Sequence, residues 1–230
     1  MRRFSQMRLF LILVISGGCF TELAAQSFRT SIETLRKKYE SVENLHMVLE
    51  LSVFEDTASG QPVYTDKIDM KRNGSFFKYV MGTQEMLLNE KYLIVVNKTS
   101  KEIMFSPRDQ KSETLMENQF QISLDSIFNV LGDPVFIETT GDVDHYTLAR
   151  KEGMISKIDF YLNRRKGLME KLAYQYREGQ KVTIRFEAFN TEPRFTEDTF
   201  SEKFFFIISN GKVKASPAFS NYVILNTAND

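Results

Sequence analysis

Cysteine, histidine, proline and tryptophan are all scarce in this chain of 230 residues. Its one cysteine, Cys19, has no second cysteine to pair with inside the chain, so the core must be stable without a disulfide. The chain has two histidines, and it contains no G-x-S-x-G motif, no His-rich spacing and no glycine-rich phosphate loop. Because no acid, base and nucleophile converge, we expect a protein that is not an enzyme and that has no metal or other cofactor.

The stretch DVDH places Asp142, Asp144 and His145 close together, as some metal sites do. On a strand, however, the two aspartates point to one face and the histidine points to the other. The pattern therefore favours a polar strand edge over a metal site.

An excess of charge of either sign is also missing. Thirty Lys and Arg residues balance thirty Asp and Glu residues. Residues 1–25 hold three arginines and one glutamate, so the remaining chain has 27 basic and 29 acidic residues, a net charge near −2. A nucleic-acid partner needs a basic surface, and so does a polybasic segment that binds anionic membranes. The composition indicates neither partner.

The chain lacks a long hydrophobic run, but it has a short one near its N-terminus. Arginines precede the run LFLILVI at 9–15, and small residues follow in ELAAQ at 22–26. This is the pattern of a secretory signal, here cleaved after Ala25, and the run is too short for a comfortable bilayer span. We expect residues 1–25 to be a signal peptide and residues 26–230 to form a single periplasmic domain.

The same segment permits a second interpretation. SGGC at 16–19 resembles a bacterial lipobox, in which the cysteine becomes the lipidated first residue. The mature protein would then be a membrane-anchored lipoprotein through Cys19.

Two segments show the periodicity of short amphipathic helices. Residues 31–43 follow a capping box formed by Thr30 and Glu33, and their apolar residues make a single stripe. Residues 123–134 begin at Ser123 and end with glycine and proline, and their apolar face contains Leu124, Ile127, Phe128 and Leu131.

From His46 onward most of the chain alternates with a period of two, and EMLLNEKYLIVVN at 85–97 and EIMFSP at 102–107 are expected to continue it as strands. In DKIDMKRNGSFFKY at 66–79, an Asn-Gly pair predicts a hairpin turn at Asn73 and Gly74. That register places Arg72 opposite Ser75, Asp69 opposite Lys78, and four apolar residues in two pairs on one face, namely Ile68 with Tyr79 and Met70 with Phe77. Arg72 then points toward the apolar side.

The second half repeats the alternation in three successive segments, 156–163, 167–176 and 181–188. Each segment has one apolar and one polar face, as expected for an antiparallel meander with one side in water. With 20 Phe and 9 Tyr residues, such a sheet has more apolar surface than two short helices obviously cover. The sheet could close on itself, fill its face with its own aromatic side chains, or enclose a cavity for an apolar ligand.

The combination resembles a known family. A signal peptide, an amphipathic helix and an antiparallel run with a helical insert are similar to the outer-membrane lipoprotein carriers of the LolA/LolB type. The segments that carry the resemblance are DMKRNGSFFKY, EMLLNEKYLIVVNKTSKEIMFSP, ISKIDFYLN and VTIRFEAF, and they lie between residues 30 and 208. Asn73 stands where the family has proline, and no tryptophan is present. The resemblance implies a mainly β (α+β) fold, a curved antiparallel sheet that forms an incomplete barrel covered by the N-terminal and mid-chain helices.

The resemblance also implies a function. Proteins of this family carry the acyl chains of lipoproteins across the periplasm, and an arginine in the matching strand holds a lid through backbone carbonyls. Here that residue is Arg72, and the lid's inner face is Ile127, Phe128 and Leu131. The expected lining of the cavity comes from five strands, with Ile68, Met70, Phe77, Tyr79, Phe160, Leu162, Leu172, Tyr174, Ile184 and Phe186.

We therefore expect a periplasmic carrier or chaperone that binds lipoprotein acyl chains or another apolar ligand, with a possible donor or acceptor protein in the envelope. Two alternatives remain open. The fold could have a filled core and act as a structural module of an envelope assembly, or the chain could be a lipid-anchored acceptor through Cys19.

Overall fold

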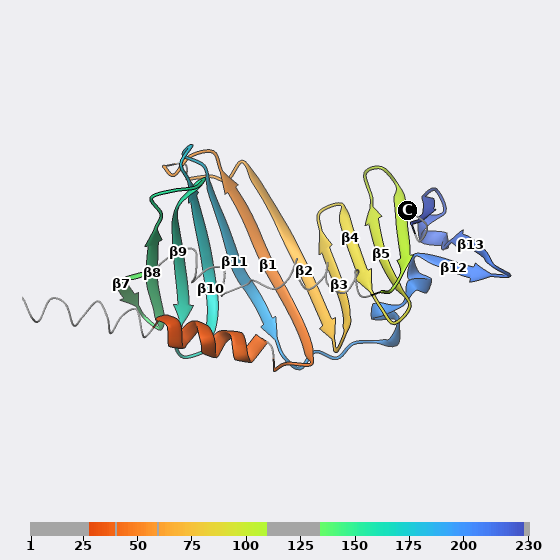
Figure 1. Ribbon diagram of the computed structural model, residues 1–230, viewed down its shortest axis with the longest axis horizontal. Coiled ribbons are helices and arrows are strands. Elements are labelled where there is room, and N and C mark those ends of the chain that lie inside the picture. The colour runs from red at the N-terminus through yellow and green to blue at the C-terminus, as the bar shows by residue number, and fades with distance from the viewer. Residues whose placement is uncertain (1–27, 40, 59, 110–133, 228–230) are drawn as a thin grey trace, which may run out of the picture. The chain divides into compact units, whose positions relative to one another are not determined.

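The structure is a computed structural model that describes residues 28–39, 41–58, 60–109 and 134–227 (Figure 1). The signal segment, Cys19 and the apolar face of the mid-chain helix lie outside the described residues, and so do the three predicted lid residues Ile127, Phe128 and Leu131. Within the described ranges, no helix is both long enough and apolar enough to cross a membrane.

The described chain is mainly β, with a large curved sheet that does not close, so the predicted fold class is confirmed. Twelve strands form this sheet in the order β14-β6-β5-β4-β3-β2-β1-β11-β10-β9-β8-β7, and β12 and β13 form a separate hairpin. The strands are β1 (Asn44–Phe54), β2 (Tyr64–Asn73), β3 (Phe76–Met81), β4 (Gln84–Leu88), β5 (Tyr92–Asn97), β6 (Glu102–Pro107), β7 (Val135–Thr140), β8 (Val143–Ala149), β9 (Ile155–Asn163), β10 (Leu168–Tyr176), β11 (Lys181–Asn190), β12 (Phe206–Ser209), β13 (Lys212–Ala215) and β14 (Val223–Asn226).

Contacts within the chain divide it into two compact units. Unit 1 comprises residues 1–39, 54–61 and 124–183, and unit 2 comprises residues 40–53, 62–123 and 184–230.

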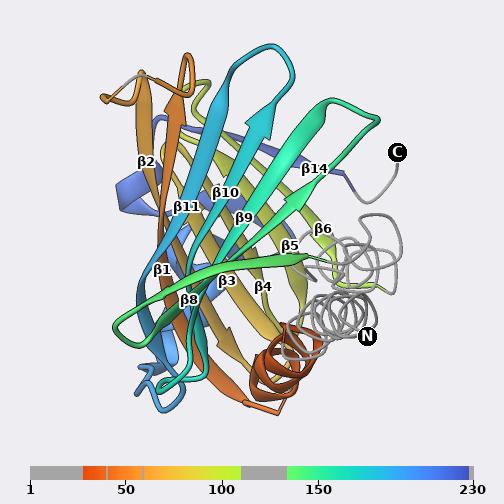
Figure 2. The ribbon, with the colours of Figure 1, turned by 90° about the vertical axis from the view of Figure 1, so that its left-hand side faces the viewer.

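Unit 1 contains the antiparallel meander β8-β9-β10 (Figure 2), with one face covered by the N-terminal helix. The ring of Phe28 lies 4.9 Å from that of Tyr146 and 5.0 Å from that of Phe160. Ile32 and Leu35 continue the same helical stripe and are buried as well. The helix therefore supplies the apolar cover that the one-sided alternation of these strands requires.

The described part of this helix spans residues 28–39, which corrects the predicted range of 31–43. Thr30 lies inside the helix and accepts a hydrogen bond on its backbone oxygen from the hydroxyl of Thr34, so it does not cap the N-terminus. At the other end Val42 lies outside the helix, in the connection to β1. The apolar stripe at Phe28 extends the helix toward the N-terminus beyond the capping residues chosen from the sequence.

Unit 2 contains the meander β1 to β6, to which β14 adds a parallel edge strand beside β6. One face of β4, β5 and β6 packs against a cluster from the C-terminal segment, which includes the short 3-10 helices η1 (Glu197–Phe200), η2 (Glu202–Phe204) and η3 (Pro217–Phe219). The buried members from the strands are Leu87, Ile94, Val96, Ile103 and Phe105, and those from the C-terminal segment are Phe200, Phe205, Phe206 and Phe219.

The hairpin of β2 and β3 has a different register from the predicted one. Its turn residues are Gly74 and Ser75, and Asn73 pairs with Phe76. Gly74 has a φ of 56°, whereas Ser75 is not among the residues with positive φ, a combination that fits a turn with glycine at its first central position. Both Asn73-Gly74 and Gly74-Ser75 are dipeptides that favour a two-residue hairpin turn. The turn forms at Gly74-Ser75.

The shift also changes the charged pairs. Lys78 lies opposite Lys71 rather than opposite Asp69, and it forms an ion pair of 3.0 Å with Glu85. Asp69 instead contacts Lys71 at 2.7 Å and His46 at 3.2 Å. The two-residue shift leaves every side chain on its predicted face, because the period of a strand is two.

Candidate ligand-binding face

An unbroken row of directly paired residues crosses unit 2 from β1 to β14. Each member lies opposite the next in the neighbouring strand, and the row runs Met47, Met70, Tyr79, Met86, Val95, Met104, Leu225. Paired residues in adjacent strands share a face of the sheet. Four methionines therefore lie in one line across the strands.

Apolar residues also flank this row on the same face. Ile68 pairs with Met81 on one side of it, and Arg72 pairs with Phe77 on the other. We call the apolar part of this surface the methionine face, and it consists of Met47, Ile68, Met70, Phe77, Tyr79, Met81, Met86, Val95 and Met104. It brings together Ile68, Met70, Phe77 and Tyr79, the four lining residues that the sequence predicts in β2 and β3.

The two faces of β4 to β6 differ in burial. The residues that contact the C-terminal aromatic cluster are 0–4% exposed. On the methionine face, Met86, Val95 and Met104 are each only partly buried. These strands are therefore apolar on both sides, with one side sealed and the other partly accessible.

Arg72 lies at one end of the methionine face. Its guanidinium donates a hydrogen bond to the backbone carbonyl of Val42, in the connection that leads into β1. Burial lowers the pKa of the Arg72 guanidinium from its usual value. An arginine keeps its positive charge under all ordinary conditions, so this donor is permanent.

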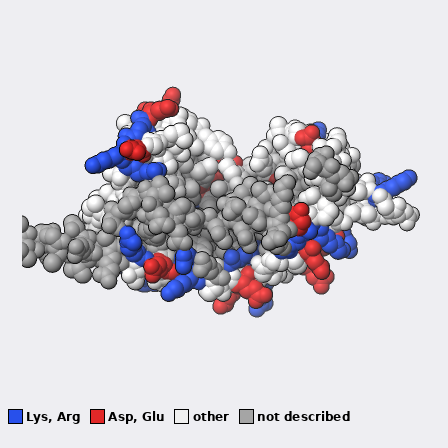
Figure 3. All heavy atoms as spheres, viewed as in Figure 1, with Lys and Arg blue, Asp and Glu red and all other residues white. Residues whose placement is uncertain are grey.

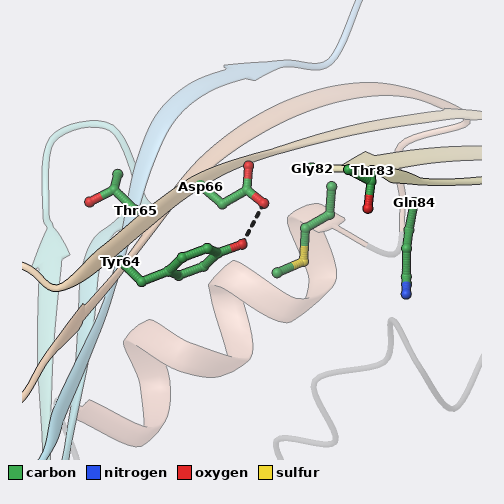
Figure 4. A pocket seen from close by; sticks show the side chains of 7 residues that line it. Tyr64, Thr65, Asp66, Gly82, Thr83 and Gln84 are labelled. Atoms are coloured by element: carbon green, nitrogen blue, oxygen red, sulfur yellow. Dashed lines mark hydrogen bonds between the residues drawn. The ribbon is translucent and has the colours of Figure 1, made fainter. Parts of the chain in front are cut away.

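A pocket lies at the opposite end of the same face of β2 (Figure 4). It is lined by Tyr64, Thr65, Asp66, Met81, Gly82, Thr83 and Gln84. The hydroxyl of Tyr64 donates to Asp66 at 2.7 Å, and this hydrogen bond raises the pKa of Tyr64. Asp66 alternates with Ile68, Met70 and Arg72 along β2. The apolar stretch of β2 is thus bounded by a carboxylate at one end and a guanidinium at the other.

The four lining residues predicted in β9 and β10 lie in unit 1. Phe160, Leu162 and Leu172 are 1–5% exposed, and Phe160 contacts Phe28 of the N-terminal helix. Tyr174 is partly buried, and burial, with a smaller effect of Tyr176, raises its pKa to about 12. The chain itself therefore packs against this part of the predicted lining. Ile184 and Phe186 lie on β11 in unit 2 and are partly buried.

The polar face of unit 1 carries a compact charged group around Asp159. The carboxylate of Asp159 lies 2.9 Å from His145 and 3.0 Å from Lys157. The ring of His145 stacks on the ring of Tyr161, with 4.3 Å between their centroids. The ammonium group of Lys171 lies 3.7 Å from the centroid of the Tyr161 ring. Among the described residues, no group of three or more His, Cys, Asp and Glu side chains is arranged to hold a metal ion.

Sequence reasoning missed most of the methionine face. Met86, Val95 and Met104 lie in segments that are predicted as strands. Within each segment, a period of two shows which residues share the face of Met86, Val95 or Met104, but it does not show that these three faces coincide. The pairing of β4 with β3 and of β6 with β5 is what aligns them with Met70, and it follows from the short turns between the strands.

Comparisons of sequence give no match, either to a family model or to a curated protein. Comparison of structures gives several similar proteins. Lipoprotein LppX from Mycobacterium tuberculosis is 7% identical over 72% of this chain and 96% of its own, with a TM-score of 0.42. MucB, in the MucA/MucB complex from Pseudomonas aeruginosa, is 12% identical over 81% of this chain and 63% of its own, with a TM-score of 0.42.

A LolA superfamily protein from Nitrosomonas europaea is 8% identical over 77% of this chain and 98% of its own, with a TM-score of 0.34. The similar solved structures include this member of the LolA superfamily, the type that the sequence resembles. At these identities the likeness concerns the fold alone.

Proposed function

We propose that this protein is a periplasmic carrier that binds an apolar chain, such as the acyl chain of a lipoprotein, on the methionine face and catalyses no reaction. The observation that carries the proposal is the row of four methionines, Tyr79 and Val95, which is apolar across β1 to β6. Met47 is buried, with 7% exposed, and the other members of the row are partly buried. The secretory pattern of residues 1–25 supports the periplasmic location.

The chemistry of methionine fits this role. Its side chain is unbranched, flexible and polarizable, and methionine is common on surfaces that accept varied apolar partners. Each methylene removed from water contributes roughly 0.8 kcal/mol, so an acyl chain of a dozen carbons gains on the order of 10 kcal/mol before the costs of association. Release therefore requires that the bound chain be exposed again, without any covalent step.

Arg72 is the proposed control point for that release. Its hydrogen bond to the carbonyl of Val42 ties β2 to the connection between the N-terminal helix and β1. Breaking this bond loosens the connection at Val42, which then depends on the backbone hydrogen bond that Gly74 donates to the carbonyl of Glu43 at 3.0 Å. We propose that Arg72 acts as a latch, with a lipid as ligand and with an envelope protein as donor or acceptor.

A structural module is the second candidate, and one observation favours it. Phe160, Leu162 and Leu172, which the carrier hypothesis assigned to a cavity, are 1–5% exposed beneath the N-terminal helix. This part of the fold is a filled core. A chain with a filled core throughout would act by docking to an envelope assembly. A lipid anchor at Cys19 is compatible with either function.

A fluorescent fatty acid, dansyl-undecanoic acid, tests the carrier. Replacing both Met86 and Met104 by glutamine keeps their size but makes the face polar, and we expect probe binding to weaken by a factor of about 30. The matched control is Met154→Gln, at a methionine that is 79% exposed outside the face, and it should bind as the original protein does.

Two results would remove the carrier proposal. One is unchanged probe affinity in the Met86→Gln, Met104→Gln variant. The other is an original protein that neither binds the probe nor carries lipid in mass spectra of the purified sample, which would leave the structural module. Arg72→Leu, tested alongside, should speed probe dissociation if Arg72 is a latch.

A further inference from the structure

The β12–β13 hairpin is separate from the large sheet. It is hydrogen-bonded only as a two-stranded sheet among the described strands, and Figure 1 shows it as a distinct pair of arrows. Asn210 and Gly211 form its turn with φ values of 51° and 73°, as a type I′ turn requires. The tight turn holds the two strands in one register, Ile207 opposite Lys214.

The base of the hairpin is fixed by aromatic packing. Phe205 and Phe206 are fully buried, and the ring of Phe206 lies 4.8 Å from that of Phe105 in β6. The hydroxyl of Ser216 donates to the carbonyl of Phe204 at 2.6 Å, which closes the end of the hairpin. The strands therefore extend from a rigid support.

Beyond that base the apolar side chains are exposed. Ile207 is 50% exposed and Ile208 is 43% exposed, although consecutive residues of a strand point to opposite faces. Phe204, the last residue of η2 before the hairpin, is 49% exposed. Val213, opposite Ile208, packs against the aromatic cluster, but both isoleucines of β12 remain largely exposed, which packing within the chain does not explain.

Within residues 203–215 the charged side chains all have one sign. Residues 203–215 contain Lys203, Lys212 and Lys214 and no acidic residue, in a chain whose total charge is balanced. All three lysines are exposed. Figure 3 shows basic and uncharged atoms at the far end of the hairpin.

We propose that the β12–β13 hairpin docks this protein on an anionic lipid surface. Isoleucine and phenylalanine side chains enter the boundary between headgroups and acyl chains, and lysines keep their ammonium groups at the lipid phosphates while their stems lie along apolar surface. The proposal goes beyond the carrier function, because the hairpin contains no residue of the methionine face. It gives the protein a place to meet a membrane.

Sedimentation with vesicles tests the docking surface. The vesicles are phosphatidylcholine with about one third phosphatidylglycerol, and pure phosphatidylcholine for comparison. Each lysine near an anionic surface strengthens binding about fivefold, so Lys212→Gln with Lys214→Gln should weaken binding to anionic vesicles about 25-fold. Binding of the original protein should fall steeply with salt and be weak on the neutral vesicles.

The apolar contribution has its own variant. Ile207→Ser with Ile208→Ser should abolish most binding while keeping every charge. Two controls change the same chemistry elsewhere at exposed positions, Lys37→Gln with Lys151→Gln for charge and Met154→Ser for apolar surface. All variants keep the same N-terminus, so any contribution of residues 1–27 is common to them. Circular dichroism verifies that each variant is folded.

The proposal is overturned if the original protein does not bind anionic vesicles, or if both hairpin variants bind as tightly as the controls. The second result would leave the exposed strand edges of the hairpin for a protein partner instead. The dansyl-undecanoic acid assay separates this proposal from the carrier function. Hairpin variants that still bind the probe but not vesicles support docking, whether or not the methionine variants confirm the carrier.

Discussion

Replacing Asp159 by asparagine should destabilise unit 1 more than any other single change of a charge on its polar face. The side chain is only 7% exposed, and its carboxylate contacts Lys157 at 3.0 Å and His145 at 2.9 Å. Asparagine has nearly the same shape but no charge. The substitution therefore removes the electrostatic interaction and leaves the packing in place.

The magnitude follows from these two contacts. A hydrogen bond to a charged group contributes roughly 1.5–3 kcal/mol, and breaking a fully buried pair costs about 3–5 kcal/mol. Lys157 is 37% exposed and regains water when its partner is lost, which favours the lower part of these ranges. We expect Asp159→Asn to lower the free energy of unfolding by about 2 kcal/mol at neutral pH.

The cost should depend on pH with a defined sign. Burial alone would raise the pKa of Asp159, but its interactions with His145 and Lys157 hold it below its usual value. A carboxylate with a depressed pKa stabilises the folded state above the unfolded pKa, near 3.9, and loses that contribution as pH falls through the folded pKa. The difference between the two proteins should therefore shrink below about pH 4.

Urea unfolding followed by circular dichroism measures both effects. The matched control is Asp142→Asn, because Asp142 also has an ion pair at 3.0 Å, with Arg165, but the two side chains are 46% and 77% exposed. An exposed pair contributes roughly 0–1 kcal/mol, so the control should change little. Equal costs for the two variants, or a cost for Asp159→Asn that persists in acid, would refute the reasoning.

Three further substitutions test other parts of the structure. Gly82→Ala should destabilise by about 1–2 kcal/mol in thermal unfolding, because Gly82 has a φ of 52° and a Cβ would lie 2.6 Å from Asp66, whereas Gly60→Ala meets nothing within 4 Å. Phe206→Ala removes a fully buried ring and should cost about 3–5 kcal/mol in urea unfolding. Arg72→Met should cost about 1–2 kcal/mol in the same assay, since it leaves a backbone carbonyl without its donor.

The strands of the second half were predictable from the sequence almost to the residue. Their segments were placed at 156–163, 167–176 and 181–188, and the structure has β9, β10 and β11 at Ile155–Asn163, Leu168–Tyr176 and Lys181–Asn190. Each of these strands has one polar face, so the period of two is plain in the sequence. The bulge in β10 between Met169 and Lys171 is the exception, since the buried residues Met169 and Leu172 lie three positions apart and break the alternation.

The hairpin of β2 and β3 shows what local patterns can and cannot decide. Two neighbouring dipeptides, Asn73-Gly74 and Gly74-Ser75, both suit a tight turn, and local preference selected the wrong one. The partners of Met70 and Lys78 were consequently wrong, but their faces were right. The parity of a strand is thus more secure than its register, because a shift by two preserves it.

Pairings between segments far apart in the sequence could not be predicted from local patterns. Nothing local indicates that β14 adds to β6 in parallel, or that the C-terminal phenylalanines pack on β4 to β6. A signal for the second contact did exist, since YLIVV and EIMF are apolar at consecutive positions rather than alternate ones. Such runs are typical of strands buried on both faces.

The packing of the C-terminal phenylalanines on β4 to β6 changes which apolar surface of the sheet is left accessible to a ligand. The aromatic content left open whether the sheet closes, fills its face with its own rings or encloses a cavity, and Phe200, Phe205, Phe206 and Phe219 fill one face of β4 to β6. In unit 1, Phe28 of the N-terminal helix packs against Phe160 of β9. On the other side of β4 to β6, the methionine face stays partly accessible at Met86, Val95 and Met104. A flexible apolar chain suits flexible side chains better than a rigid aromatic wall does, so the glutamine variants on this face test the carrier more directly than any change to a phenylalanine.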